Sequence, residues 1–372
     1  MKKEWYCENR KKAIEEWKDL KYGMFIHFGL YSLCGGYWKG EKVTRGYSEQ
    51  ILSHGNVAFC DYEALKEEFS IEHFNADEIA LLAKEAKMSY IVLVTKHHDG
   101  FCLFNTKTTS YNSVNSACKR DIVKEISQAC QRNGLKLGLY FSWIDWHCVD
   151  ALPISSHNSD KIPPLHMKYN LTQIEELLTG YGDICELWMD MGNPTPEQSS
   201  QVRELALRLQ PNIMINGRVW NDMGDFLTMG DNQFPDCALS LPWQTPATIY
   251  HETWGYREWQ ERTDFEEKVE TINKGLHYVV ENGGNYLLNI GPKGDGSLVD
   301  FEVEVLKAVG KEIENAPLER KPIEATPLVV DNANFTLLNG EKVYRYTGSE
   351  YYTFHPIVTG LNYTLTLEED GV

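Results

Sequence analysis

The chain has 372 residues, enough for one large domain with a small one attached or for a single barrel with insertions. Its formal net charge of −18 excludes the basic footprint that nucleic-acid binding needs, and an anionic membrane surface would repel it. The nine cysteines are scattered without a CxxC pair, so neither a disulfide framework nor a zinc site is expected. There is no apolar leader and no run of about 18 apolar residues. These features predict a cytoplasmic protein.

Short apolar segments separated by amphipathic stretches run through most of the chain. This order favours a parallel sheet, and at this length a barrel. A further strand is expected to end near Trp254. The other expected strands, in chain order, span residues 23–29, 90–96, 135–142, 185–190, 213–216, 225–229 and 286–290.

The helices between these strands carry start and stop signals. Asn75 and Asp121 each stand where a cap residue would open a helix, and Gly134 stands where a C-cap would close the second one. Thr172 and Asp264 are expected to open two further helices, and residues 302–314 read as another. The alternation of strand and helix predicts a (β/α)8-type barrel over residues 1–316.

Composition changes after residue 316. Pro317, Pro322 and Pro327 punctuate a stretch that then alternates apolar and polar residues, as strands with one buried face do. We expect a small antiparallel, β-sandwich-like domain over residues 317–372. It contains no obvious chemistry.

Polar residues with chemical potential follow one predicted strand after another. In a parallel barrel the active site is built from these carboxyl-terminal strand ends and the loops after them. A single strand-end histidine is more often structural, but the repetition favours a shared site. The residues concerned are His27, His97, His98, Tyr140, Asp190, Arg218 and Asp231.

Asp190 closes an apolar run, and a carboxylate in that place must be hydrogen-bonded, paired or functional because burying it alone is costly. An N-cap or a strand-end salt bridge is the structural alternative. His97 and His98 could serve as metal ligands, but the remaining histidines and cysteines lack ligand spacing. Adjacent strand residues also point to opposite faces, so one of the two would bind and the other support. We expect no metal and no cofactor.

Taken together, six segments resemble the α-L-fucosidases of glycoside hydrolase family 29, over roughly residues 15 to 315 of the chain. Each segment alone is weak evidence for this family, but six segments in the family's order are specific evidence. They are residues 21–32 (KYGMFIHFGLYS), 90–101 (YIVLVTKHHDGF), 138–147 (GLYFSWIDWH), 187–192 (LWMDMG), 253–256 (TWGY) and 283–292 (GGNYLLNIGP).

The resemblance implies a retaining exo-α-L-fucosidase acting on a terminal α-L-fucoside, with Asp190 as the nucleophile. Asp231 is the expected general acid/base, with Glu252 as the alternative. Self-association is left open. The residues expected to bind the sugar are His27, Trp38, Glu49, His97, His98, Tyr140, Trp188, Arg218 and Trp254.

The chain departs from the family pattern at the acid/base. An aspartate, Asp231, stands where many relatives have glutamate, and Gln244 replaces a second carboxylate. These changes keep open a fucose-binding relative with little or no catalysis. A second alternative is an exo-hydrolase of a related sugar such as an α-L-galactoside, which differs by a hydroxyl at C6 and would be distinguished by the shape of the pocket.

Overall fold

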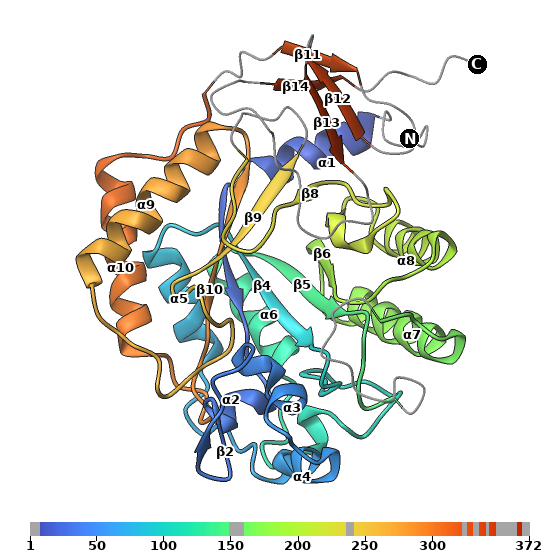
Figure 1. The fold of residues 1–372 in the computed structure, drawn as a ribbon, viewed down its shortest axis with the longest axis vertical. Helices are drawn as coiled ribbons and strands as arrows, with labels where there is room; N and C mark the ends of the chain where they lie inside the picture. The colour runs from blue at the N-terminus through green and yellow to red at the C-terminus, as the bar shows by residue number, and fades with distance from the viewer. Residues whose placement is uncertain are drawn as a thin grey trace.

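The computed structural model describes residues 8–148, 160–235 and 242–321, together with four short strands nearer the C-terminus. Eight parallel strands form its central sheet, in the order β7-β6-β5-β4-β1-β10-β9-β8 (Figure 1). An isolated parallel bridge between Asn216 and Phe226 joins the two edges and closes the barrel. The strands are β1 Tyr22–Ile26, β4 Tyr90–Lys96, β5 Lys136–Ser142, β6 Ile184–Asp190, β7 Met214–Ile215, β8 Leu227–Thr228, β9 Trp243–Thr248 and β10 Asn285–Ile290.

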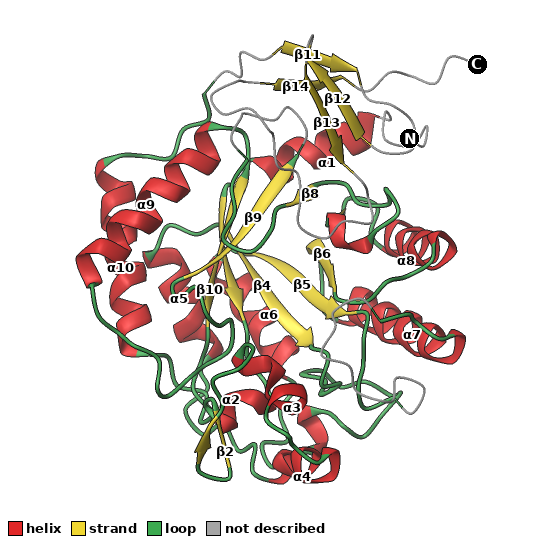
Figure 2. Cartoon of the chain, viewed as in Figure 1, coloured by secondary structure: helices red, strands yellow, loops and turns green. Residues whose placement is uncertain are grey.

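Helices cover the outside of this sheet (Figure 2). Long helices follow or connect most of the strands. Between β7 and β9, however, the only helical element in the described residues is the 3-10 turn η6 (Gly217–Val219). The α-helices are α1 Glu8–Lys18, α2 Leu30–Cys34, α3 Ile51–His54, α4 Phe59–Ala64, α5 Ala76–Glu85, α6 Ile122–Asn133, α7 Pro164–Gly180, α8 Pro196–Leu209, α9 Phe265–Glu281 and α10 Asp300–Asn315. The shorter elements are η2 Ser48–Gln50, η3 Leu65–Glu67, η4 Ser113–Asn115 and the hairpin β2 Tyr37–Trp38 with β3 Glu41–Lys42.

Side chains alternate between the two faces of each barrel strand. Inward-facing residues, among them Phe25, Tyr140 and Trp188, pack into an aromatic core inside the barrel. Trp17 of α1 joins this core and stacks on Phe226, with ring centroids 4.3 Å apart. The barrel is therefore filled, and a ligand can enter only at one of its ends.

Two predicted helix caps are confirmed. The side chain of Asn75 accepts hydrogen bonds from the first turn of α5, and Asp121 does the same for α6, which Gly134 ends at a φ of 68°. The prediction for Thr172 is wrong, because α7 already begins at Pro164. Thr172 lies inside the helix, where its hydroxyl donates to the carbonyl of Lys168 at 3.0 Å.

The strand predicted to end near Trp254 is also wrong. The barrel strand in this part of the chain is β9, which ends at Thr248, and Trp254 lies in the loop after it. The expected β region follows residue 321 as β11 Thr326–Val329, β12 Phe335–Asn339, β13 Lys342–Tyr346 and β14 Tyr363–Thr366. They form one sheet, in which β11, β12 and β13 pair antiparallel and β14 pairs parallel to β11. The domain boundary at residue 316 and the sandwich stay predictions.

Candidate active site

The predicted strand-end residues meet in a cavity of about 360 Å³, large enough for one small ligand. It lies at the carboxyl-terminal end of the barrel, where parallel barrels place their active sites. Nine of the residues predicted from the sequence line it: His27, Glu49, His97, Tyr140, Trp188, Asp190, Arg218, Asp231 and Trp254.

Asp190 ends β6 and points into this cavity with 5% of its surface exposed. One carboxylate oxygen accepts from the hydroxyl of Tyr140 at 3.0 Å, and the other accepts from Arg218 Nη1 at 3.0 Å. Met191 and Gly192 then turn the chain away through left-handed backbone, with φ of 62° and 72°. The donors to its two oxygens hold the carboxylate in one orientation toward the cavity.

A chain of hydrogen bonds behind Asp190 settles the tautomer of His97. The amide of His98 donates to His97 Nδ1 at 2.8 Å, so the neutral ring carries its proton on Nε2. Nε2 lies 3.1 Å from the hydroxyl of Tyr140, which in turn donates to Asp190. Burial lowers the pKa of His97 to about 3, so the ring stays neutral and this direction holds.

His27 follows β1, and its tautomer is opposite to that of His97. Its Nδ1 lies 2.7 Å from the side-chain oxygen of Asn289, whose amide nitrogen donates to the carbonyl of Trp254. Nδ1 is therefore the protonated nitrogen, and Nε2 is left as an acceptor. Burial lowers the pKa of His27 well below its usual value. The ring thus offers a neutral acceptor to a hydroxyl in the cavity.

Arg218, in η6, joins the two aspartates. Its Nη1 binds Asp190 and its Nη2 binds Asp231 at 2.8 Å, so one planar guanidinium spans both carboxylates. The guanidinium also lies over the ring of Trp188, 4.9 Å from its centroid. The side chain of Asp231 is 24% exposed and that of Asp190 only 7%, so Asp231 lies nearer the mouth.

Glu49, in η2, is a third carboxyl group in the cavity lining and is almost fully buried. The amide of Gly255 donates to its Oε2 at 2.9 Å. Burial raises the pKa of Glu49 to about 7, while this hydrogen bond and nearby Arg257 act in the other direction. Glu49 therefore exchanges a proton near neutral pH.

Three predicted residues do not line the cavity. His98 is buried with its ring stacked on Trp146, 3.9 Å between centroids. Trp38 lies in the hairpin strand β2, and Glu252 is exposed in the loop after β9. Their roles in substrate binding and catalysis stay predictions that this geometry does not favour.

Five lining residues were not predicted. Phe25 lies two positions before His27 on the same strand face, and that spacing could have revealed it. Tyr47 and Gln50 flank Glu49, and Gln233 follows Asp231 by two positions, but they lie in turns that have no such period. Met191 directly follows Asp190.

Gln244 lies below the cavity, inside the barrel. Its side-chain oxygen accepts from Trp188 Nε1 at 2.7 Å, and its nitrogen donates to both oxygens of Glu186 at 3.1 and 3.2 Å. Trp17 also donates to Glu186, whose pKa burial raises to about 7. The glutamine is therefore part of the support beneath Trp188.

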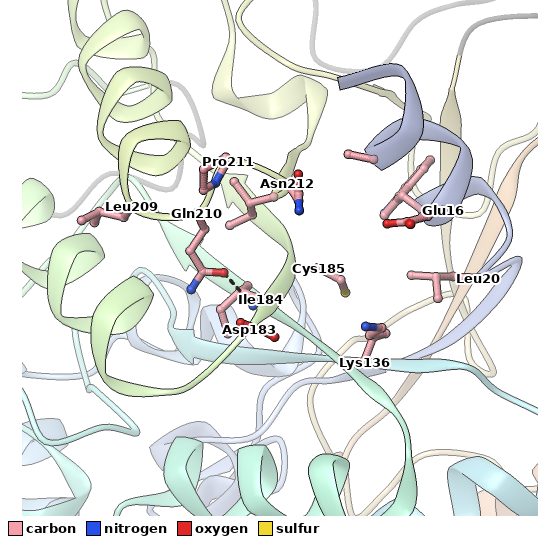
Figure 3. Close-up of a pocket in the computed structure, with 13 residues that line it drawn as sticks. Glu16, Leu20, Lys136, Asp183, Ile184, Cys185, Leu209, Gln210, Pro211 and Asn212 are labelled. Carbon is pink, nitrogen blue, oxygen red and sulfur yellow. Dashed lines mark hydrogen bonds between the residues drawn. The ribbon is translucent and has the colours of Figure 1, made fainter. Parts of the chain in front are cut away.

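A second cavity, of about 300 Å³, lies at the opposite end of β5 and β6. Figure 3 shows Lys136, Asp183 and Cys185 around it, with Glu16 of α1 and Leu20, which follows that helix, on one side. The side-chain oxygen of Gln210 there accepts from the amide of Ile184 at 2.8 Å, so it caps the start of β6. The three carboxyl groups of the first cavity, Glu49, Asp190 and Asp231, do not line this second one.

Among residues 8–148, 160–235 and 242–321, no group of three or more histidine, cysteine or acidic side chains could hold a metal ion. The seven cysteines in these ranges are free thiols. In the same part of the chain no helix is long and apolar enough to cross a membrane.

A closed parallel barrel with two carboxylates held on one arginine, beside neutral histidines and aromatic faces, defines a class of protein. It is the arrangement of a glycoside hydrolase that uses one carboxylate to attack and a second acid to protonate.

Comparison with known proteins gives the family. The sequence model described as "Alpha-L-fucosidase" matches residues 1–315. Human plasma α-L-fucosidase is 30% identical over 319 residues, covering 80% of this chain and 67% of its own, and the Dictyostelium discoideum α-L-fucosidase is 30% identical over 78% and 68%. The chain belongs to the α-L-fucosidase family.

Solved structures agree with this placement. The α-L-fucosidase AlfC from Lactobacillus casei, in complex with α-L-fucose, superposes with a TM-score of 0.74 at 32% identity, over 82% of this chain and 99% of AlfC. A Bacteroides thetaiotaomicron α-L-fucosidase, trapped as a covalent intermediate with 2-fluoro-fucosyl fluoride, gives 0.73 at 26% identity, over 82% and 75%. The predicted barrel and the predicted class of enzyme are confirmed.

Proposed function

We propose that this protein is a retaining exo-α-L-fucosidase in which Asp190 is the nucleophile and Asp231 the general acid/base. The observation that carries the assignment is the pair of carboxylates on the two arms of the Arg218 guanidinium, inside a cavity at the end of the barrel. Relatives in the family are described with α-L-fucose and fucosides bound, which supports fucose as the sugar.

In the first step Asp190 attacks the anomeric carbon and forms a glycosyl ester, while the bond to the aglycone oxygen breaks and that oxygen takes a proton from Asp231. In the second step Asp231 takes a proton from water, whose oxygen displaces Asp190 from the sugar. Tyr140 and Arg218 donate to Asp190 and hold its carboxylate in position as it attacks and later leaves the sugar.

Asp231 is the better candidate for the acid because it lies nearer the mouth, where an aglycone must leave. Glu49 is the alternative, since its pKa of about 7 lets it carry a proton at neutral pH. Glu252 is exposed and outside the cavity lining, so we place it behind both.

The remaining lining residues suit a small neutral sugar. His27 offers an acceptor to a hydroxyl, as its tautomer requires. Trp188 and Trp254 provide apolar ring faces for the sugar or its methyl group.

Replacing the nucleophile tests this assignment directly. In Asp190→Ala we expect release of 4-nitrophenol from the aryl α-L-fucoside to fall more than roughly a thousandfold, because no covalent ester can form. Asp77→Ala, which removes an exposed carboxylate on α5, is the matched control. Turnover of Asp190→Ala near the wild-type rate, or a wild type that hydrolyses the aryl α-L-galactoside in preference, would refute the proposal.

Two variants separate the acid candidates. Asp231→Ala should lose fucosyl disaccharides far more than aryl fucosides, whose leaving groups need little protonation, and azide should restore its rate on the aryl substrate. Glu49→Gln should show neither the larger loss on fucosyl disaccharides nor the rescue by azide. If Glu49→Gln shows both, the acid is Glu49.

A further inference from the structure

Exposure increases steadily from the floor of the cavity to its mouth. His27 and Asp190 are buried, Tyr47 is half-buried and Gln233 is exposed, yet all four line the same cavity. The acid candidate Asp231 lies two residues before Gln233. Tyr47 and Gln233 are therefore the more exposed of these four lining residues, near the end at which a group attached to the reacting sugar would lie.

Tyr47 is held on a rigid turn. Its amide donates to the side-chain oxygen of Gln50 at 3.0 Å, and the hydroxyl of Ser48 donates to the carbonyl of Tyr256 at 2.7 Å. Glu49 in the same turn accepts from Gly255. The Tyr47 ring also packs against the aromatic core inside the barrel. Its position is thus set before any ligand arrives.

The backbone of Gln233 is fixed from the other side. Its amide donates to the carbonyl of Gly230 at 3.0 Å, and its carbonyl accepts from the hydroxyl of Thr245 at 2.9 Å. Among the residues that the structure describes, its side-chain amide has no hydrogen-bond partner. A held backbone with an unengaged amide at a cavity mouth suits recognition of a polar ligand.

We infer that Tyr47 and Gln233 form an aglycone subsite that selects substrates whose fucose is linked to a neutral sugar. The inference rests on the proposed function. The ring of Tyr47 supplies an apolar face for the C–H side of the second sugar, and the amide of Gln233 supplies a donor and an acceptor for its hydroxyl or amide groups. Asp231, the proposed acid, lines the same cavity and precedes Gln233 by two residues.

The test compares two substrates that share the fucosyl group. α-L-Fucosyl fluoride has no sugar aglycone, and a fucosyl disaccharide has one. We expect Gln233→Ala and Tyr47→Ala each to lower the ratio of kcat/KM for the disaccharide to kcat/KM for the fluoride roughly tenfold, the effect of losing one contact to a substrate group. Tyr47→Phe should keep most of the ratio, because the ring remains. Gln131→Ala, an exposed glutamine on α6, is the control.

The outcomes are distinct. Unchanged ratios in both alanine variants, or equal losses on the two substrates, would overturn the subsite. Gln233→Ala keeps the test decisive if Tyr47→Ala does not fold, because its side chain is exposed. Failure of the wild type to release fluoride would instead refute the proposed function.

Discussion

At the scale of single residues, the site depends on the directions of the hydrogen bonds around Asp190. The hydroxyl of Tyr140 accepts a hydrogen bond from His97 Nε2 and donates one to the carboxylate of Asp190. Both directions follow from the amide of His98, which donates to His97 Nδ1. A histidine with its pKa near 3 cannot become charged in the working range, so the chain of donors does not reverse with pH.

Removing the hydroxyl of Tyr140 tests this relay. We expect Tyr140→Phe to lower kcat for the aryl fucoside roughly tenfold to a hundredfold, because the carboxylate loses a donor that holds its direction and stabilises its charge. Tyr22→Phe is the matched control: its buried hydroxyl has no hydrogen-bond partner among the described residues. Equal kcat values for Tyr140→Phe and wild type would show that the hydrogen bond does not contribute.

At the scale of elements, the two aspartates are supported differently. Asp190 ends a seven-residue strand, but Asp231 follows the two-residue strand β8 in a sector that, within the described residues, carries no α-helix. Asn232 compensates. Its amide donates to the carbonyl of Pro246, and its side-chain oxygen accepts from the amide of Thr248 at 2.8 Å. This anchors the loop to β9.

Asn232 also adopts left-handed backbone, with φ of 58°, which asparagine tolerates better than alanine. We expect Asn232→Ala to lower kcat/KM for a fucosyl disaccharide roughly tenfold more than for an activated aryl fucoside, because a misplaced acid matters most for poor leaving groups. Asn232→Gly should recover part of the loss, since glycine accepts this backbone.

Asn221→Ala provides the matched control for this loop. Asn221 is likewise left-handed, with φ of 53°, and is anchored by hydrogen bonds to Pro194 and Ser199, but it does not line the cavity. The same preference for activated substrates in Asn221→Ala would mean that the effect is general loosening, and the role of Asn232 would have to be abandoned.

The elements also show what the sequence could reveal. Strand β4 was predictable because its apolar run is continuous and ends in polar residues, and β6 because only Glu186 interrupts its apolar run before Asp190. Strand β9 was not, because its sequence WQTPAT carries glutamine, threonine and proline into a buried wall, where Gln244 is satisfied only by partners on other strands. These contacts join residues far apart in the sequence, so the local pattern of residues does not reveal them.

The same distinction applies to the site. Residues at strand ends, such as His27 and Asp190, could be predicted because the period of the strand fixes their direction. His98 follows His97 directly, turns away and packs on Trp146. Tyr47 and Gln233 lie in turns, where direction depends on anchors elsewhere in the fold.

At the scale of the whole molecule, buried carboxyl groups link stability to pH. Glu302 of α10 is buried and accepts from the amide of Gly291 at 3.1 Å, and burial raises its pKa from 4.5 to about 8. Because the folded state holds this proton more tightly, the free energy of unfolding falls as pH rises from about 4.5 to about 8, by up to about 1.4 kcal/mol per pH unit.

Denaturant unfolding of Glu302→Gln across pH 5 to 9, a window of roughly four units around that transition, measures this contribution. The glutamine oxygen still accepts from Gly291, but the side chain does not titrate, so the variant should lose less stability than wild type as pH rises. Glu304→Gln changes an exposed glutamate on the same helix and should follow wild type. Parallel curves for all three proteins would exclude a contribution from Glu302.

The sector of the barrel between β7 and β9 has a consequence for how such an enzyme changes over time. In the proposed mechanism the attacking carboxylate, Asp190, ends a barrel strand, whereas the proposed acid, Asp231, lies on a loop anchored to a neighbouring strand. Insertions or exchanges in that loop leave the barrel strand intact. If the proposed roles hold, a change of glycan target would require changes in this one segment and none in the strand that ends at Asp190.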